Sequence, residues 1–240
     1  MLCVFMFVIK LMRKRKYGHL QPQDKIEDFM IEDIENYYDY KKRNPNMTEN
    51  AVESEASIHN LVGTAKISCS SLPLNLHIIS RVLPNSSYYK QKFAAITIRL
   101  GNPICTCLLF TSGKMVLTGC RTYIDCIFAS HLISKLLQTH VPGVSFNLRS
   151  VRIQNIVGNV DMNLKNQEMD LNRLHQDKSI FCTYQKNMFP GLIYRPNDCP
   201  VVLLIFTSGK IVITGGKTTK DIKVGWELLK PFIQSYIKPV

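Results

Sequence analysis

Amide, hydroxyl and small apolar side chains recur in this sequence at the spacing of a β-strand. Asn60, Val62 and Thr64 alternate at period two, as do Val116 and Thr118. Successive side chains of a strand point to opposite faces of its sheet, so each alternating set lies on one face. The same period selects Leu108, Phe110, Asn155, Val157, Leu204, Phe206, Val212 and Thr214.

A face of this composition, rimmed by Lys and Arg, suits the minor groove of DNA. Base edges there offer few hydrogen bonds, amides can read the acceptors of A·T pairs, and apolar side chains can wedge between base steps. The core of an ordinary two-layer fold would show the same alternation. The pattern by itself therefore leaves both interpretations open.

The chain contains an internal repeat. Residues 108–122, LLFTSGKMVLTGCRT, return as residues 204–218, LIFTSGKIVITGGKT, with an offset of 96 and ten of fifteen positions identical. The motif IHNLVG at 58–63 returns as IQNIVG at 153–158, and Phe93 has its counterpart in Phe189. A unit of this length is too long for a solenoid repeat, which predicts two halves of one pseudosymmetric domain.

The elements that carry these residues are expected to form one sheet. Segments rich in β-branched and aromatic residues predict strands, and helical periodicity predicts helices between them. We expect strands at 58–68, 93–100, 104–110, 115–118, 151–162, 191–194, 201–206 and 211–214, and helices at 74–83, 123–138 and 220–236. Helices packed on one face of an antiparallel sheet leave the other face open to a partner.

Positive charge is concentrated in the repeats. The net charge is +12, from 30 Lys+Arg and 18 Asp+Glu. Residues 1–57 carry 9 basic and 10 acidic residues, which leaves 21 basic and 8 acidic residues in 58–240. This excess predicts attraction to nucleic acid or to an acidic partner, although a solvated basic surface would have the same composition.

The cysteines do not predict a metal site, and the N-terminus predicts neither a membrane span nor a secretory signal, although a short interfacial anchor stays open. The eight cysteines include no C-x-x-C pair, and no histidine pair follows at zinc-finger spacing. Cys105 and Cys107 share a strand face and are expected to be small buried apolar residues. The apolar segment 1–9 is shorter than the roughly 20 residues that a membrane-spanning helix needs. The basic residues 13–16 follow this segment, whereas in a secretory signal the basic residues precede the apolar ones.

Several longer motifs resemble the TATA-box-binding protein family. They are KFAAITIRL (92–100) and LLFTSGKMVLTG (108–119) in the first half, and IQNIVG (153–158), FPGLIYR (189–195) and LLIFTSGKIVITG (203–215) in the second. The resemblance covers residues 58–240. It implies an α+β saddle in which two pseudosymmetric repeats, 58–150 and 151–240, share a curved antiparallel sheet with helices on the convex face. Residues 1–57 would form an N-terminal tail.

The resemblance also implies roles for individual residues in DNA binding. Two phenylalanines per half would be wedges that unstack a base step at each end of the site: Phe93, Phe110, Phe189 and Phe206. Asn60 and Asn155 would donate hydrogen bonds in the groove, helped by Thr118 and Thr214. Apolar contacts to the groove floor would come from Val62, Leu108, Val116, Val157, Leu204 and Val212. Phosphate contacts would come from Lys92, Arg99, Lys114, Arg121, Arg195, Lys210 and Lys217.

The function implied is that of a general transcription initiation factor that binds and bends A·T-rich promoter DNA. Its partners would be double-stranded DNA, initiation factors and RNA polymerase, with no cofactor and no membrane. Contact with a B-type initiation factor is doubtful, because Gln185 and Asn187 stand where the family has two glutamates. Such departures indicate a divergent copy. A cellular protein of this kind would be nuclear, whereas one from a large DNA virus would lie in the cytoplasmic viral factory or the virion.

Three alternative functions have weaker support in the sequence. A TBP-like interaction protein could sequester transcription factors without specific DNA binding, although four exposed phenylalanines without a ligand would favour aggregation. An ATPase or GTPase is not expected, because Gly215-Gly216-Lys217-Thr218 lacks the first Walker glycine, replaced by Ile211. No catalytic carboxylate cluster or Ser/His/Asp arrangement supports a nuclease or glycosylase.

The tail prompts a separate hypothesis about regulation. Residues 24–40 combine seven carboxylates with apolar residues at helical spacing, including Phe29, Ile34 and Tyr37. This composition is that of a DNA mimic, and tethering would give it a high effective concentration at the DNA-binding face. The hypothesis is therefore that residues 1–57 inhibit DNA binding in the same chain, and a disordered tail without this role is the alternative.

Overall fold

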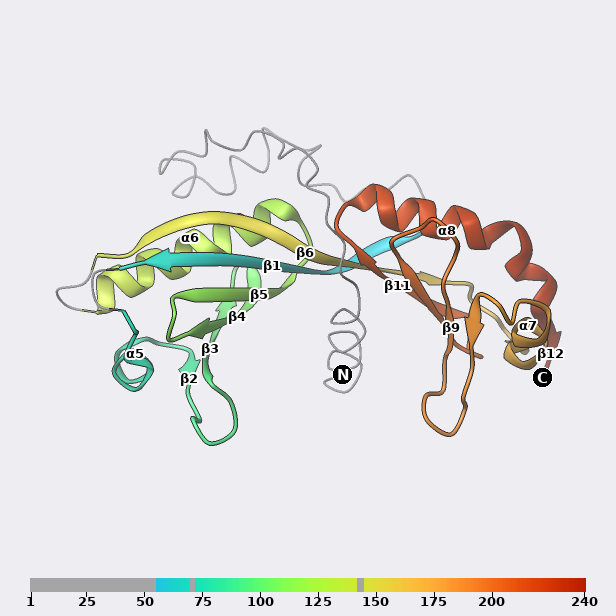
Figure 1. Ribbon diagram of the computed structural model, residues 1–240, viewed down its shortest axis with the longest axis horizontal. Coiled ribbons are helices and arrows are strands. Elements are labelled where there is room, and N and C mark those ends of the chain that lie inside the picture. The colour runs from blue at the N-terminus through green and yellow to red at the C-terminus, as the bar shows by residue number, and fades with distance from the viewer. Residues whose placement is uncertain (1–54, 70–71, 142–144) are drawn as a thin grey trace.

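The computed structural model describes residues 55–69, 72–141 and 145–240, which form a saddle-shaped α+β fold (Figure 1). The tail hypothesis concerns residues 24–40, which lie outside the described residues. The main sheet has ten antiparallel strands in the order β2-β3-β4-β5-β1-β6-β11-β10-β9-β8. Their bounds are β1 Ser57–Ser68, β2 Ser86–Ser87, β3 Ala95–Gly101, β4 Ile104–Phe110, β5 Lys114–Cys120, β6 Asn147–Asp161, β8 Cys182–Thr183, β9 Leu192–Tyr194, β10 Val202–Ile205 and β11 Lys210–Gly216.

The two halves meet at an approximate two-fold axis between β1 and β6. Asn60 pairs with Val157 across these strands, and Val62 pairs with Asn155, so corresponding residues exchange places. From this centre outward, the first half has the order β1-β5-β4-β3-β2 and the second half has the corresponding order β6-β11-β10-β9-β8. The two pseudosymmetric halves predicted from the repeat, and the α+β saddle implied by the resemblance, are thereby confirmed.

Side-chain alternation along β1 separates two faces of the sheet. Leu61, Ala65 and Ile67 are almost fully buried, whereas Asn60, Val62 and Thr64 are only partly covered. The predicted period-two pattern is thus present from Asn60 to Ile67, whereas register shifts interrupt it at the start of β1, where Ile58 is also buried. The buried side forms the core, and the other side is the concave face of the saddle.

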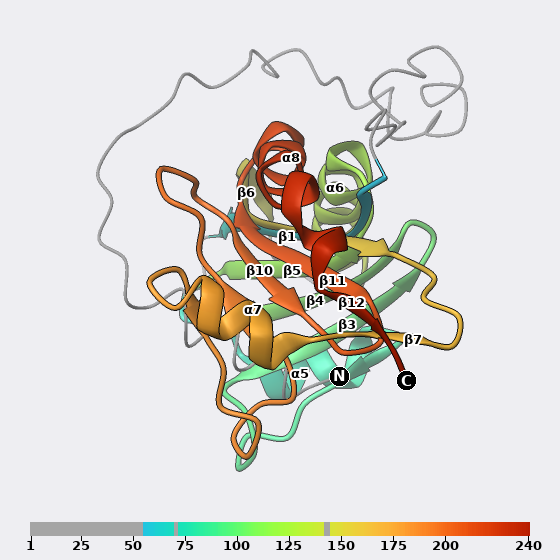
Figure 2. The same ribbon diagram turned by 90° about the vertical axis from the view of Figure 1, so that its right-hand side faces the viewer.

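Two long helices cover the convex side of the sheet (Figures 1 and 2). Helix α6 (Tyr123–His140) begins after Thr122, whose hydroxyl accepts the Asp125 N–H, and helix α8 (Thr219–Ile233) begins with a capping box between Thr218 and Asp221. Such caps satisfy backbone N–H groups that the first turn leaves unpaired. α8 ends three residues before the predicted bound, and the chain continues as the 3-10 turn η1, Gln234–Tyr236.

Residues 163–178 contain elements that the sequence did not predict. They form β7 (Gln167–Met169) and α7 (Leu171–Asp177), and β7 pairs with β12 (Ile237–Pro239) in a second, two-stranded sheet. Asp170 caps α7, and the hydrogen bond from the Arg173 N–H lowers the pKa of its carboxyl group. A strand of three residues is too short to show an alternating pattern in the sequence. Its stability comes instead from pairing with a strand about seventy residues later, which local sequence does not reveal.

Other predicted bounds differ by a few residues. β6 begins at Asn147, four residues before the predicted strand, so the boundary placed between residues 150 and 151 falls inside this strand. In the first half, α5 (Leu76–Val82) lies within the predicted helix 74–83. β4 has the predicted bounds at both ends.

Cysteines in the described residues are part of the apolar interior. Cys105 and Cys107 are 2% and 0% exposed, and burial raises the pKa of the Cys182 thiol to about 11. Among residues 55–69, 72–141 and 145–240, no group of three or more His, Cys, Asp or Glu side chains could hold a metal ion. Within the same residues, no helix has the length and apolar character needed to cross a bilayer.

Candidate nucleic-acid interface

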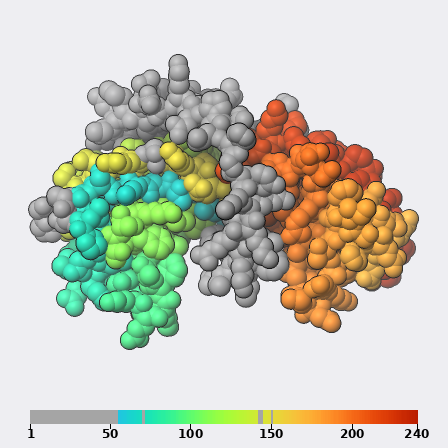
Figure 3. Space-filling view, viewed as in Figure 1, coloured from blue at the N-terminus to red at the C-terminus, as the bar shows by residue number. Residues whose placement is uncertain are grey.

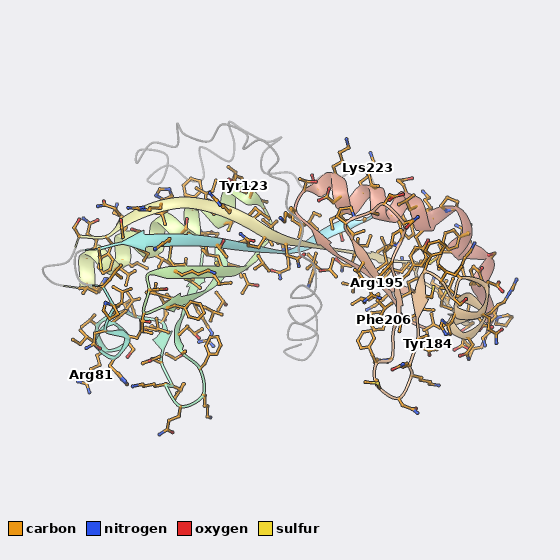
Figure 4. All side chains as sticks on the ribbon, viewed as in Figure 1. Arg81, Tyr123, Tyr184, Arg195, Phe206 and Lys223 are labelled. Atoms are coloured by element: carbon orange, nitrogen blue, oxygen red, sulfur yellow. The ribbon has the colours of Figure 1, made fainter. Side chains whose placement is uncertain are left out.

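The concave face gathers the polar and apolar residues that alternation selected. Figure 3 shows the two lobes from the side, and Figure 4 shows Tyr123 and Lys223 on the helical side, with Phe206 and Arg195 on the opposite side of the right-hand lobe. Cross-strand pairing joins Thr64 to Val116, and Val62 to Thr118. In the second repeat Thr214 pairs with Val157, and Val212 with Leu204. Each lobe therefore presents the same set of residue types on this face.

An asparagine amide is held in a fixed orientation in each repeat. The Gly119 N–H donates to Asn60 Oδ1 at 2.8 Å, and the Gly215 N–H donates to Asn155 Oδ1, also at 2.8 Å. Since a backbone N–H requires an acceptor, these bonds identify the amide oxygen and place the NH₂ group elsewhere. Asn155 Nδ2 donates to Thr214 Oγ1 at 3.1 Å. Asn60 Nδ2 donates to Thr118 Oγ1 at 3.3 Å, so in both amides the second N–H makes no hydrogen bond within the described residues.

Glycine in a β-bulge makes this arrangement possible. The β1–β5 register skips Gly119, and the β6–β11 register skips Gly215. Both residues have positive φ, +94° and +100°, which other L-residues rarely adopt. The bulge turns the glycine N–H out of the strand ladder and toward the asparagine oxygen. Local sequence thus builds the same Asn–Thr–Gly cluster twice.

Each lobe carries a pair of aromatic rings where the loop before one outer strand, β3 or β9, meets the end of the neighbouring strand, β4 or β10. Phe93 and Phe110 have ring centroids 6.2 Å apart, and Phe189 and Phe206 have centroids 5.8 Å apart, both pairs edge to face. Phe93 is 48% exposed, unlike the aromatic residues of the core. Edge-to-face contact holds the rings in fixed orientation. The structure therefore brings together all four predicted wedge residues as two pairs.

Gly191 explains the closer approach of the second pair. A Cβ atom at Gly191 would lie 2.8 Å from Phe189 Cε1 and 3.0 Å from Phe206 Cε1. The corresponding residue of the first repeat is Ala95, which pairs with Phe110. Beside Ala95, the ring centroids of the first pair are 6.2 Å apart, compared with 5.8 Å beside Gly191.

The two repeats differ in how much of this face is exposed. Asn155, Thr214 and Leu204 are 2%, 3% and 0% exposed, whereas Asn60, Thr118 and Leu108 are partly exposed. Leu204 shares the face of its cross-strand partner Val212, but its side chain has no accessible surface. Its contact with a ligand, and that of Asn155 and Thr214, remains a prediction.

The predicted phosphate-contacting residues lie on strands β3, β5 and β11 and in the segments that precede or follow strands. Lys114 and Lys210 begin the equivalent strands β5 and β11, and Arg99 alternates with Thr97 in β3. Lys92 lies in the loop before β3, with its ammonium group 5.8 Å from the Tyr89 ring centroid. Arg195 follows β9, and its N–H donates to the Phe181 carbonyl oxygen. Arg121 and Lys217 follow the two glycine bulges.

Sequence reasoning missed further residues on this face. Asn159 lies two positions beyond Val157, and its Oδ1 is buried without a hydrogen-bond partner. Gln154 donates from Nε2 to Thr64 Oγ1 at 2.8 Å. Lys66 continues the alternation of Asn60, Val62 and Thr64. The same period-two pattern could have identified Asn159 and Lys66.

Asn60→Asp provides a test of the amide's role. An aspartate still accepts the Gly119 N–H, so the fold is expected to persist, but it offers no donor and brings a negative charge to the face. We expect the affinity for an A·T-rich duplex to fall roughly 10- to 100-fold. Gln138→Glu makes the same amide-to-acid change on the convex helix α6, where Gln138 is exposed, and should have a much smaller effect. Equal effects of both variants, measured by fluorescence anisotropy, would contradict this role.

Comparisons with known proteins agree with this geometry. The family described as "Transcription factor TFIID (or TATA-binding protein, TBP)" matches residues 55–140 and 150–236. The chain is 35% identical over 186 residues to the TBP-related factor of Drosophila melanogaster, covering 78% of this chain and 80% of that protein. It is 37% identical over 181 residues to the TATA-box-binding protein of Tetrahymena thermophila, covering 75% and 70% of the two chains.

A solved structure shows the same architecture. The TBP of Methanococcus jannaschii superposes with a TM-score of 0.62 at 32% sequence identity. The match covers 76% of this chain and 99% of the archaeal chain. Both repeats are therefore included in the similarity.

Proposed function

Because the chain belongs to the TATA-box-binding protein family and is a transcription factor of that type, we propose that it binds and bends A·T-rich promoter DNA through the minor groove to start transcription. The single observation that supports this most strongly is the aromatic pair beside the outer strands of each lobe, with an oriented asparagine amide on each of the two central strands, β1 and β6, between the pairs. In this proposal the rings open base steps at the two ends of the site while the amides bind its centre.

Preference for A·T pairs would follow from the donors at the centre. The minor-groove edge of an A·T pair presents only the acceptors A N3 and T O2, whereas a G·C pair adds the guanine N2 amino donor. The free amide N–H groups of Asn60 and Asn155 match acceptors and would oppose a second donor. Val62 and Val157 lie on the same face beside them and leave little room for the amino group.

Bending would be the energetic consequence of the wedges. Unstacking a base step costs a few kcal/mol, and a bent duplex offsets this cost by contacting more protein surface. A concave sheet with cations at its rim offers such a surface, since Lys114 and Lys210 stand at equivalent positions of the two lobes. Neither wedges nor cations alone would favour the bent state.

The partners would be DNA, other initiation factors and RNA polymerase, with action in the nucleus if the protein is cellular. Catalysis is not part of the proposal. The loop before Phe189 bears on one partner: Gln185 accepts the N–H groups of Met188 and Phe189 through its carbonyl, and Met188 is 82% exposed. With Gln185 and Asn187 in place of acids, this loop is neutral to basic. We propose that a B-type factor, if recruited, does not depend on an acidic pair here.

Sequestration of transcription factors without DNA binding is less favoured. Phe93 is 48% exposed in the described structure. A protein that bound its partners through the convex side alone would have no use for an exposed phenylalanine on the concave side.

Selection of bound sequences from random duplexes tests the proposal. We expect strong enrichment of sites with a continuous A·T-rich core. Enrichment of G·C-rich sites, or the absence of any enrichment above the input pool, would contradict minor-groove recognition.

A further inference from the structure

The concave face carries a row of cations in the first repeat that has no equivalent in the second. Lys66 of β1 pairs directly with Lys114 of β5 on one side and with Arg149 of β6 on the other. Directly paired residues of an antiparallel sheet share a face, with Cβ atoms about 5 Å apart. We call Lys66, Lys114 and Arg149 the basic row. Arg152, paired with Thr64, adds a fourth cation beside it.

The basic row faces the same side as the groove-binding residues. Asn60, Val62, Thr64 and Lys66 succeed one another at period two in β1, with the intervening residues buried. All members of the row are exposed. None of the ion pairs between two described residues includes any of them.

The corresponding position of the second repeat has the opposite charge. Lys114 and Lys210 are equivalent residues, but Lys210 pairs with Asp161 where Lys114 pairs with Lys66. The sequence shows the same asymmetry on a larger scale. Residues 58–150 contain nine Lys and Arg residues and one acidic residue, whereas residues 151–240 contain twelve Lys and Arg residues and seven acidic residues. The one acidic residue of the first repeat, Asp125, belongs to the convex helix α6.

Adjacent like charges in a sheet are unfavourable unless a counter-charge lies against them. A DNA backbone supplies closely spaced phosphates, and each neutralised phosphate also releases condensed counterions. Lys114 stands among the residues proposed to contact phosphate, and Lys66 beside it and Arg149 one strand further on continue the same line of cations for the DNA backbone.

We propose that the basic row is an additional phosphate-binding site that holds the DNA backbone more strongly on the first repeat than on the second. The inference rests on the proposed function, because it needs DNA on the concave face. It assigns to Lys66 and Arg149 sequence-independent contacts that raise affinity and its salt dependence without changing base preference. The pseudosymmetric saddle is in this respect electrostatically one-sided.

Charge-altering variants test the proposal in the full chain on one A·T-rich duplex. Lys66→Gln with Arg149→Gln is expected to reduce the slope of log affinity against log salt by about two, since each phosphate contact contributes about 0.9. Bending and the order of preference among duplex sequences are expected to stay as in the parent protein. Lys223→Gln with Lys220→Gln removes two cations from the start of the convex helix α8 and should leave the slope nearly unchanged.

An exchange of charges between the repeats adds a control at constant net charge. Lys66→Asp alone should reduce the slope, and adding Asp161→Lys should restore it, because a pair of cations then forms beside Lys210. An unchanged slope in the Lys66 and Arg149 variants, in a parent protein that bends the duplex, would overturn the inference alone. Failure of the parent protein to bind or bend A·T-rich DNA would overturn the proposed function and the inference with it.

Discussion

Replacing Phe93 and Phe206 together by alanine is expected to remove most of the DNA bending and to weaken binding strongly. One wedge is lost from each lobe, and stacking of an aromatic side chain on a base contributes about 1–3 kcal/mol. The two losses correspond to a decrease in affinity of roughly 30-fold to 10⁴-fold. Affinity and bending should fall together, because the wedges stabilise the bent state. Energy transfer between dyes at the duplex ends reports the bend directly.

The control for this variant is an exposed apolar residue away from the interface. Leu228 on the convex helix α8 is 43% exposed, close to the 48% of Phe93. Leu228→Ala should leave both bending and affinity unchanged. Thermal unfolding of all variants shows whether the fold is retained. Normal bending by a folded Phe93→Ala/Phe206→Ala protein would refute the role of the rings.

Salt is expected to weaken binding by several orders of magnitude. Seven basic residues are proposed to contact phosphates, and this number corresponds to a slope of log affinity against log salt of about −6. Affinity should then fall roughly 10³- to 10⁵-fold between 50 and 200 mM salt, and the basic row of the first repeat makes the slope steeper. Titrations at four salt concentrations are enough to measure it.

Single variants connect this slope to particular residues. Lys210→Ala should reduce the slope by about one, whereas Lys223→Ala on the convex side should not change it. A flat salt response of the parent protein would favour a protein that sequesters transcription factors over one that binds DNA.

Sequence patterns gave the strands and the shared face because these depend on local alternation. β4 has the predicted bounds, and β1 shows the expected alternation from Asn60 to Lys66. The internal repeat also predicted two equivalent halves, which the reciprocal pairing of Asn60 and Val62 with Val157 and Asn155 confirms. These features need no knowledge of tertiary contacts.

Features that depend on contacts distant in sequence were not predictable. The bond from Gly119 to Asn60 joins residues 59 apart, and only the bulge in the folded sheet brings them together. Pairing of β7 with β12 likewise requires the C-terminus to return beside Gln167. The full burial of Leu204, next to a partly exposed Val212, also has no signal in the alternation.

Base pairs that change the chemical groups of one groove and not of the other give the most direct test of minor-groove binding. Inosine is guanine without its 2-amino group, so an I·C pair has the minor-groove edge of an A·T pair and the major-groove edge of a G·C pair. A duplex with every A·T pair of the selected site replaced by I·C should be bound and bent almost as well as the original. Replacement by G·C should cost about 1–3 kcal/mol per pair. Loss of binding to the I·C duplex equal to that for the G·C duplex would contradict recognition through the minor groove.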